Sequence, residues 1–210
     1  MPATPVRRSG RPLCSKNRSS FAKPIATLRT SAGLPSGRLA LWWLLASEVV
    51  IFGGLLASYV MQRIGHPEWA YEAEHTNVWF GAGNTIILLT SSLSAVLAHQ
   101  AAQTGDGKKA ARYLWMTIGG ALWFLVNKSI EWTGEIQHGF TITKSGFWSF
   151  YYTAAGLHGL HVIAGATAMA FVAMDAAKNK ELQRVEYVGI YWHLVDVIWI
   201  FLFPLLYIAK

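Results

Sequence analysis

Seven ionisable side chains lie within long apolar stretches of this sequence, where an isolated charge is most costly. They are Glu48, Lys128, Glu131, His158, His161, His193 and Asp196. A charged side chain at the centre of a membrane helix costs roughly 2.5–3.5 kcal/mol, so such residues usually face a partner inside a bundle and serve a function. Their types permit histidine ligation of haem or metal, carboxylate–histidine hydrogen bonding, or ion pairing.

Depth along the helices favours carboxylate–histidine hydrogen bonding. At 1.5 Å rise per residue, Glu48 and Asp196 each lie about 14 Å from one membrane face, and His161 lies about 20 Å from it. We therefore expect a polar cluster near mid-membrane in which Glu48 hydrogen-bonds to His161. His158 belongs to the same predicted cluster, and His193 and Asp196 form a second polar pair nearby.

Ligation of haem or metal is less well supported by the spacing. Bis-histidine haem binding needs rings at matched depth, but His193 lies roughly 10 Å off the level of His161. A copper or di-iron site has enough histidines and carboxylates, but no HExxH or ExxH spacing appears. Lys128 and Glu131 are three residues apart, which predicts an ion pair on one helix face.

The elements that must hold these side chains are membrane helices. The chain of 210 residues is 53% hydrophobic and only 14% charged, whereas soluble domains carry roughly 25% charged residues. Five apolar stretches are each long enough to span a bilayer, and this length selects helices. They run approximately over residues 39–62, 76–99, 113–132, 148–174 and 187–208. The sequence therefore predicts an all-α integral membrane bundle of five transmembrane helices within residues 39–210, with Pro204 perturbing the last helix.

The basic residues indicate an orientation. Residues 1–38 hold eight Lys and Arg and no acidic residue, which predicts a disordered basic tail. Together with two loops, this side of the membrane has fourteen basic residues, against three on the other side. The positive-inside rule then places the N-terminus in the cytoplasm and the C-terminus outside. Because the net charge of +7 comes from this tail and the loops, no nucleic-acid partner is expected.

Five short segments match, in order, the motifs of one membrane protein family. YWHLVDVIWIFLFPLLYI begins at Tyr191, GLHGLHVIAG begins at Gly156, and LASEVVIFGG contains Glu48. NTIILLTSS begins at Asn84, and IEWTGEIQHGFTIT contains Glu131. Over about residues 40–208, these segments resemble subunit III of cytochrome c oxidase and related haem–copper oxidases, in the five-helix form of many bacteria.

The resemblance implies a non-redox subunit of a proton-translocating oxidoreductase, which reduces oxygen to water with electrons from cytochrome c or quinol. The chain alone would not be catalytic and would hold no metal, because haem and copper belong to the partner subunits. Subunit I is the expected main contact, with subunit II also present. The implied role is support of assembly and of proton uptake by subunit I, with phospholipids bound near Glu48, His158 and His161.

Several alternatives remain open on the sequence. Within the family, the chain could belong to a nitric oxide reductase complex, which shares the five-helix plan. From other classes, it could be a free-standing membrane haem b cytochrome or a proton-coupled transporter. The expected location is the bacterial plasma membrane, with the mitochondrial inner membrane as the alternative.

Overall fold

The protein is described here from a computed structural model that covers residues 36–209. All regular structure in this range is helical, which confirms the predicted all-α class. The elements are α1 (Ser36–Gly65), α2 (Trp69–Ala73), α3 (Val78–Gln103), α4 (Gly107–Gln137), α5 (Gly146–Ala177), α6 (Arg184–Phe203) and the π-helix η2 (Pro204–Ile208). Most of the predicted basic tail lies outside the described residues, and its last three positions, 36–38, open α1.

Four helices are long and apolar enough to cross a membrane: Gly37–Gly65, Val78–Gln103, Gly146–Ala177 and Arg184–Ile208. They correspond to the first, second, fourth and fifth predicted spans. The third predicted span lies within α4, which has 31 residues. Its apolar stretch is diluted by Asn127, Lys128 and Glu131. Five transmembrane helices were predicted; the described residues have six α-helices, four of them apolar enough to be candidate spans, and the short α2 forms in the loop after α1.

Side-chain caps explain where three of the helices begin. Asn77 accepts a hydrogen bond from the amide of Trp79 at the start of α3, and Asp106 accepts one from Lys109 at the start of α4. Ser145 caps α5 in the same way. Such caps satisfy amide groups that have no partner within the helix. The cap at Asp106 starts α4 six residues before the predicted span, because helix formation continues beyond the apolar region.

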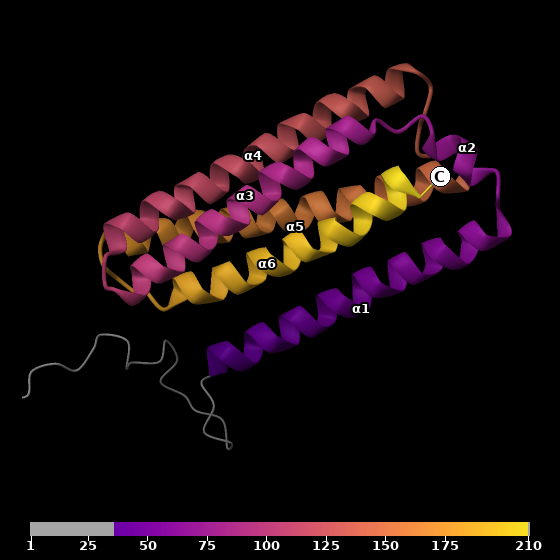
Figure 1. Cartoon of the computed structure of the whole chain (residues 1–210). Helices are drawn as coiled ribbons and strands as arrows, with labels where there is room; N and C mark the ends of the chain where they lie inside the picture. The colour runs from indigo at the N-terminus through magenta and orange to yellow at the C-terminus, as the bar shows by residue number, and fades with distance from the viewer. Residues whose placement is uncertain (1–35, 210) are drawn as a thin grey trace, which may run out of the picture.

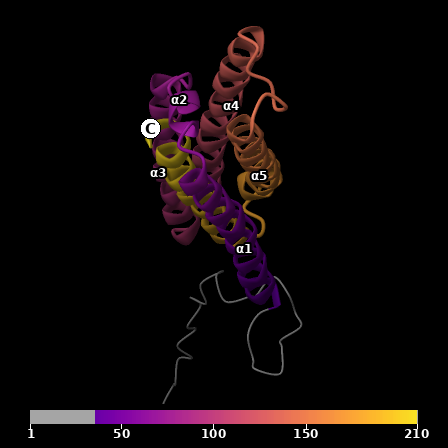
Figure 2. The same cartoon turned by 90° about the vertical axis from the view of Figure 1, so that its right-hand side faces the viewer.

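The helices α3, α4, α5 and α6 pack together as a bundle, and α1 lies along it against α6 and α5 (Figures 1 and 2). Close approach of α3 and α4 depends on Gly120, because a Cβ added there would lie 2.7 Å from the Cβ of Ser91. Small residues at such crossings are the usual basis of helix packing in membranes. The helix α1 is packed least: 11% of its most apolar stretch is buried, against 33–39% in the other three candidate spans.

Pro204 changes the end of the last span. The α-helix α6 stops at Phe203, and residues Pro204–Ile208 continue as a single π turn. Proline has no N–H to donate to the helix ladder, and the turn instead closes with the amide of Ala209 donating to the carbonyl of Pro204 at 2.8 Å. The predicted perturbation at Pro204 therefore takes the form of a wider turn, which carries the buried Tyr207.

Candidate functional site

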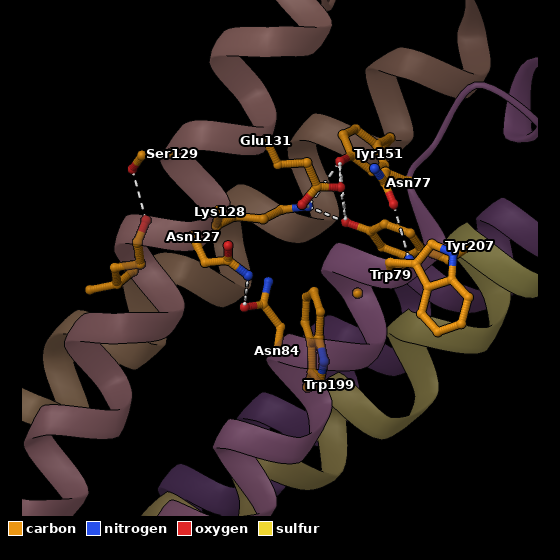
Figure 3. A network of polar contacts seen from close by, with 12 residues as sticks. Asn77, Trp79, Asn84, Asn127, Lys128, Ser129, Glu131, Tyr151, Trp199 and Tyr207 are labelled. Carbon is orange, nitrogen blue, oxygen red and sulfur yellow. Dashed lines mark hydrogen bonds and ion pairs between the residues drawn. The ribbon is translucent and has the colours of Figure 1, made fainter.

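A buried ionic network joins α4, α5 and η2 near one end of the bundle (Figure 3). Lys128 and Glu131 lie one turn apart on α4, and their side chains approach to 3.0 Å between Nζ and Oε2. The ammonium of Lys128 also donates to the hydroxyl of Tyr151 at 2.9 Å and to the hydroxyl of Tyr207. The structure thus brings the predicted ion pair together and surrounds it with two tyrosines.

Every strong donor of this network has a partner. The ammonium group of lysine has three N–H donors, and these go to Glu131, Tyr151 and Tyr207. The two tyrosine hydroxyls in turn donate to Oε1 of Glu131, at 2.9 Å from Tyr151 and 2.7 Å from Tyr207. The opposite charges cancel, and every donor of the network is bonded to an acceptor within it. Under these conditions an ion pair can be buried without a large net penalty.

A second pair joins α1 to α5. Nε2 of His161 lies 2.8 Å from Oε2 of Glu48, with side-chain exposures of 19% and 9%. The other ring nitrogen, Nδ1, lies 2.7 Å from the backbone carbonyl of Leu157. A carbonyl can only accept, so Nδ1 carries a proton. Nε2 of His161 approaches Oε2 of Glu48 at ion-pair distance, but the two groups are not aligned as a hydrogen bond.

Oε2 of Glu48 has no aligned hydrogen bond among residues 36–209. The contact with His161 is therefore a close approach of a carboxylate and an imidazole between α1 and α5, with hydrogen-bonding capacity left unused.

His158 does not join this pair. It is fully buried on α5, and neither ring nitrogen has a hydrogen-bond partner within the described part of the chain. Its ring contacts those of Phe124 and Trp199 at centroid distances of 5.4 and 5.1 Å, and these two rings also contact each other. The predicted cluster therefore separates into the Glu48–His161 contact and an isolated histidine among aromatic rings.

The structure does not bring His193 and Asp196 together as a pair. Nδ1 of His193 lies 2.6 Å from the hydroxyl of Ser92 on α3. Asp196 is 3% exposed, and both of its carboxylate oxygens are without a hydrogen-bond partner within residues 36–209. The physical reason is that α6 packs on α3, so His193 finds a closer partner there. In the same residue range, no three His, Cys, Asp or Glu side chains converge as a metal ion would need.

Sequence reasoning missed three contributors to the polar core. Tyr151 and Tyr207 complete the Lys128 network, and Asn127 donates to Oδ1 of Asn84 at 2.7 Å between α4 and α3. A usable signal existed: a lysine inside a span needs three acceptors, and only hydroxyl, amide or carboxylate groups within other spans can supply them. Tyrosines in a membrane protein are easily assigned to the interface instead.

Fold and site together define an integral membrane helical protein that buries ionisable groups, some of them paired with one another, as in the Lys128 network, and others without a partner in the described chain, as are His158 and Asp196. The comparisons with known proteins specify the family. The family model described as Cytochrome c oxidase subunit III matches residues 30–210. This chain belongs to the cytochrome c oxidase subunit III family.

Named relatives agree with this assignment. The cytochrome c oxidase subunit 3 of Corynebacterium diphtheriae is 36% identical over 173 residues, which cover 79% of this chain and 84% of that protein. The cytochrome c oxidase subunit 3 of Thermostichus vulcanus is 32% identical over 175 residues, covering 81% and 86%. A protein of Aeropyrum pernix named heme-copper oxidase subunit I+III is 30% identical over 185 residues, which are 82% of this chain and 22% of that protein.

Proposed function

We propose that this chain is the non-catalytic subunit III of a respiratory haem–copper oxidase, which reduces oxygen to water and pumps protons. The observation that carries the proposal is the family match over residues 30–210, which includes every described helix. The buried ionisable groups support a structural and proton-related role. Glu131, Lys128, Glu48 and His161 find partners within the chain, as expected of a subunit that leaves redox chemistry to other subunits.

In this proposal five helices cross the membrane, with the N-terminus on the cytoplasmic side. The fifth is α4, whose 31 residues are more than enough to span a bilayer. Its least apolar part is the turn containing Lys128 and Glu131, and these charges cancel inside the bundle. Fourteen basic residues on the N-terminal side, against three on the other, support the orientation.

The main partner in this proposal is subunit I, with subunit II also present and cytochrome c or quinol as electron donor. The Aeropyrum pernix relative supports it, because its name assigns subunits I and III to a single polypeptide. The helix α1 leaves large apolar side chains uncovered, including Trp43, Val50 and Met61 at 72–74% exposure. Lipid or another subunit would cover this stripe in a bacterial plasma membrane.

We assign to the Glu48–His161 pair a role in proton uptake by the complex and in binding phospholipid between α1 and α5. It joins the least packed helix to the bundle and places an imidazole nitrogen 2.8 Å from a carboxylate oxygen that has no aligned hydrogen bond. The alternative of a nitric oxide reductase component is not favoured, because the relatives carry the name of cytochrome c oxidase subunit 3.

Co-purification from native membranes tests the proposal directly. The full chain with a C-terminal tag should retain a haem- and copper-containing subunit in mild detergent, with oxygen-reducing activity and the absorption bands of its haems. Membranes from cells that express the untagged chain provide the control for non-specific capture. Recovery of the chain alone, or with a haem protein that reduces nitric oxide but not oxygen, would overturn the proposal.

A further inference from the structure

Asp196 lies at the centre of the last candidate span. Twelve residues of the span Arg184–Ile208 lie on either side of it, which is about 18 Å of helix in each direction. The side chain is 3% exposed, and neither carboxylate oxygen has a hydrogen-bond partner among residues 36–209. An isolated ionised carboxylate is very costly at such a depth, so the group is neutralised by a proton unless a cation reaches it.

No cationic side chain in the described range reaches Asp196. The lysine inside α4, Lys128, directs its three donors to the network with η2 and α5. Arg184, at the start of α6, pairs with Asp175. Among residues 36–209, no three His, Cys, Asp or Glu side chains converge as a metal ion would need. A proton is therefore the cation that can neutralise Asp196.

The indole donors closest to Asp196 along α6 are already bonded to α3. Trp192 and Trp199 lie about one turn away on the same helix face. Nε1 of Trp192 donates to the hydroxyl of Ser91 at 3.1 Å, and Nε1 of Trp199 donates to the hydroxyl of Thr85 at 3.1 Å. These bonds hold α6 beside α3 (Figure 1). Neither indole N–H is left for the carboxyl group.

The other titratable groups that face α6 from neighbouring helices are engaged elsewhere. Glu48 of α1 and His161 of α5 contact each other, and the ring of His158 contacts Phe124 and Trp199. None of these groups makes a hydrogen bond with Asp196 in the described range.

A polar route connects Asp196 to the surface of the bundle. The hydroxyl of Ser92 on α3 lies beside the carboxyl group without being aligned with it as a hydrogen bond. The same hydroxyl lies 2.6 Å from Nδ1 of His193. Ser92 and His193 are both half-buried, and so is His99, which follows Ser92 by two turns towards the end of α3. The route therefore leads from the buried carboxyl group to side chains at the bundle surface.

We propose that Asp196 is a proton-binding site, held as a neutral carboxylic acid, which exchanges its proton with the bundle surface through Ser92 and His193. In the exchange, the carboxyl proton passes to the oxygen of Ser92 while the hydroxyl proton of Ser92 passes to Nδ1 of His193. The O–H bond of Asp196 breaks, an N–H bond forms on His193, and Ser92 remains a hydroxyl. The resulting carboxylate and imidazolium are together neutral, so the step creates no net charge inside the membrane.

Isotope-edited infrared spectroscopy of the full chain tests the proton site. The sequence contains three aspartates, Asp106, Asp175 and Asp196, and the first two are not buried. With aspartate labelled by ¹³C at the side-chain carboxyl group, the unmodified protein at neutral pH should show one protonated carboxyl band that shifts with the label. Asp196→Asn should remove this band, whereas the double variant Asp106→Asn, Asp175→Asn should keep it.

Transfer of the protein to deuterium oxide tests the route, because exchange of the carboxyl proton shifts the same band with time. Ser92→Ala should slow this exchange by about tenfold or more, the effect of losing one hydrogen bond to a charged group. Ser92→Thr keeps the hydroxyl and should exchange at the original rate. Thr90→Ala is the control for loss of a hydroxyl from α3, since Thr90 bonds only to the carbonyl of Ile86 among the described residues.

Three results would overturn the proposal. Absence of a protonated band in the unmodified protein would mean that Asp196 is ionised, and persistence of the band in Asp196→Asn would assign it to another aspartate. An unchanged exchange rate in Ser92→Ala would remove the route. If Asp196→Asn did not fold, the double variant would still assign the band, because Asp196 is then its only aspartate.

Use of this proton by the oxidase complex rests on the proposed function, whereas the proton site itself does not. The infrared measurement is made on the chain alone. It therefore decides the site whether or not a haem-containing subunit co-purifies, and failure of the proposed function is seen separately in the co-purification.

Discussion

Glu131 and Glu48 are both buried carboxylates with a nitrogen partner, but their surroundings differ. Glu131 lies among α4, α5 and η2, and its side chain and that of Lys128 are 1% and 6% exposed. Glu48 lies on α1, and its side chain and that of His161 are 9% and 19% exposed. The first carboxylate accepts three hydrogen bonds, whereas Oε2 of Glu48 has only the contact with His161.

The difference shows two uses of a buried charge. In the Lys128 network every donor is committed, so moving a proton would leave a charge unbalanced in a region of low dielectric. In the Glu48 pair the carboxylate oxygen Oε2 has no aligned hydrogen bond, and the pair lies on the helix with the least packing. The first arrangement fixes the ends of three helices, while the second suits a site where protons or lipid are exchanged.

The largest expected loss of stability follows from removing the ammonium group of Lys128. Lys128→Met should destabilise the protein by about 3–5 kcal/mol, because the carboxylate of Glu131 stays buried without its counter-charge. The measurement is the unfolding midpoint in detergent by circular dichroism. Lys108→Met is the control, since Lys108 is exposed on the same helix.

A double substitution separates charge from packing. Lys128→Met combined with Glu131→Gln removes both charges and keeps an acceptor for the tyrosine hydroxyls. It should recover more than half of the stability lost in the single variant. If the double variant were as unstable as Lys128→Met alone, the loss would come from packing and the charge argument would be wrong.

A smaller loss is expected from a tyrosine of the same network. Tyr207→Phe removes one donor to Glu131 and one acceptor for Lys128, which should cost about 1.5–3 kcal/mol for hydrogen bonds to charged groups. Tyr71→Phe, at a position 75% exposed, should leave the unfolding midpoint unchanged. Equal midpoints for Tyr207→Phe and the unmodified protein would show that the hydroxyl contributes nothing to the network.

These tyrosines mark the limit of what could be predicted from the sequence. Hydropathy located all five long helices, and the i,i+3 spacing identified Lys128 and Glu131, because both signals are local along the chain. The contact between Glu48 and His161 followed from matched depth. Tyr207 reaches the network only through the π turn at Pro204, which shifts the register of side chains after that point. Tyr207 points into the bundle because of how α6 ends, and the hydrophobic periodicity of the sequence does not predict that ending.

The predicted second polar pair, His193 and Asp196, shows another limit of prediction from sequence. The sequence hypothesis made His193 and Asp196 a second polar pair close to Glu48 and His161, but position along a helix does not determine which neighbour a side chain turns toward. The ring of His193 faces Ser92 because α6 packs on α3. Lateral packing of helices in a membrane is set by small residues and shape rather than by hydropathy, so the direction of a polar side chain around its helix is harder to infer than its depth.

Substitutions in the Glu48–His161 pair should change the activity of the oxidase complex more than the stability of the chain. Glu48→Ala leaves Nε2 of His161 without a partner and should cost about 1 kcal/mol, but it should shorten the time over which the oxidase complex sustains turnover. Glu48→Gln keeps a hydrogen-bonding group of the same size and removes only the titratable proton. It should therefore assemble normally and still inactivate faster, as measured by oxygen consumption under continuous turnover.

Ser47→Ala, at the exposed neighbouring position on α1, is the control for helix disturbance. Normal assembly and an unchanged turnover lifetime in both Glu48 variants would contradict a functional role for the pair. A shortened lifetime in Glu48→Ala but not in Glu48→Gln would show that the contact matters and that the carboxylate's capacity to ionise does not.

The smallest effect is expected at an exposed histidine–carboxylate contact outside the membrane helices. In the turn after α1, Nδ1 of His66 lies 2.8 Å from Oε1 of Glu68. Its own backbone amide and, secondarily, the side chain of His66 lower the pKa of Glu68 below its ordinary value. A lowered pKa in the folded state means that the stabilisation is present above the unfolded pKa, about 4.3, and is lost as the pH falls through the folded pKa.

Glu68→Gln should therefore lower the unfolding midpoint slightly at pH 7, and the difference from the unmodified protein should disappear on acidification to pH 3. Because the side chain of Glu68 is exposed, added salt should also reduce the difference. Glu74→Gln, at another exposed position in the same connection, controls for the loss of one charge. A difference that persisted at low pH and in high salt would mean that Glu68 stabilises the protein through packing. The exposed contact would then not differ from the buried pairs in its dependence on charge.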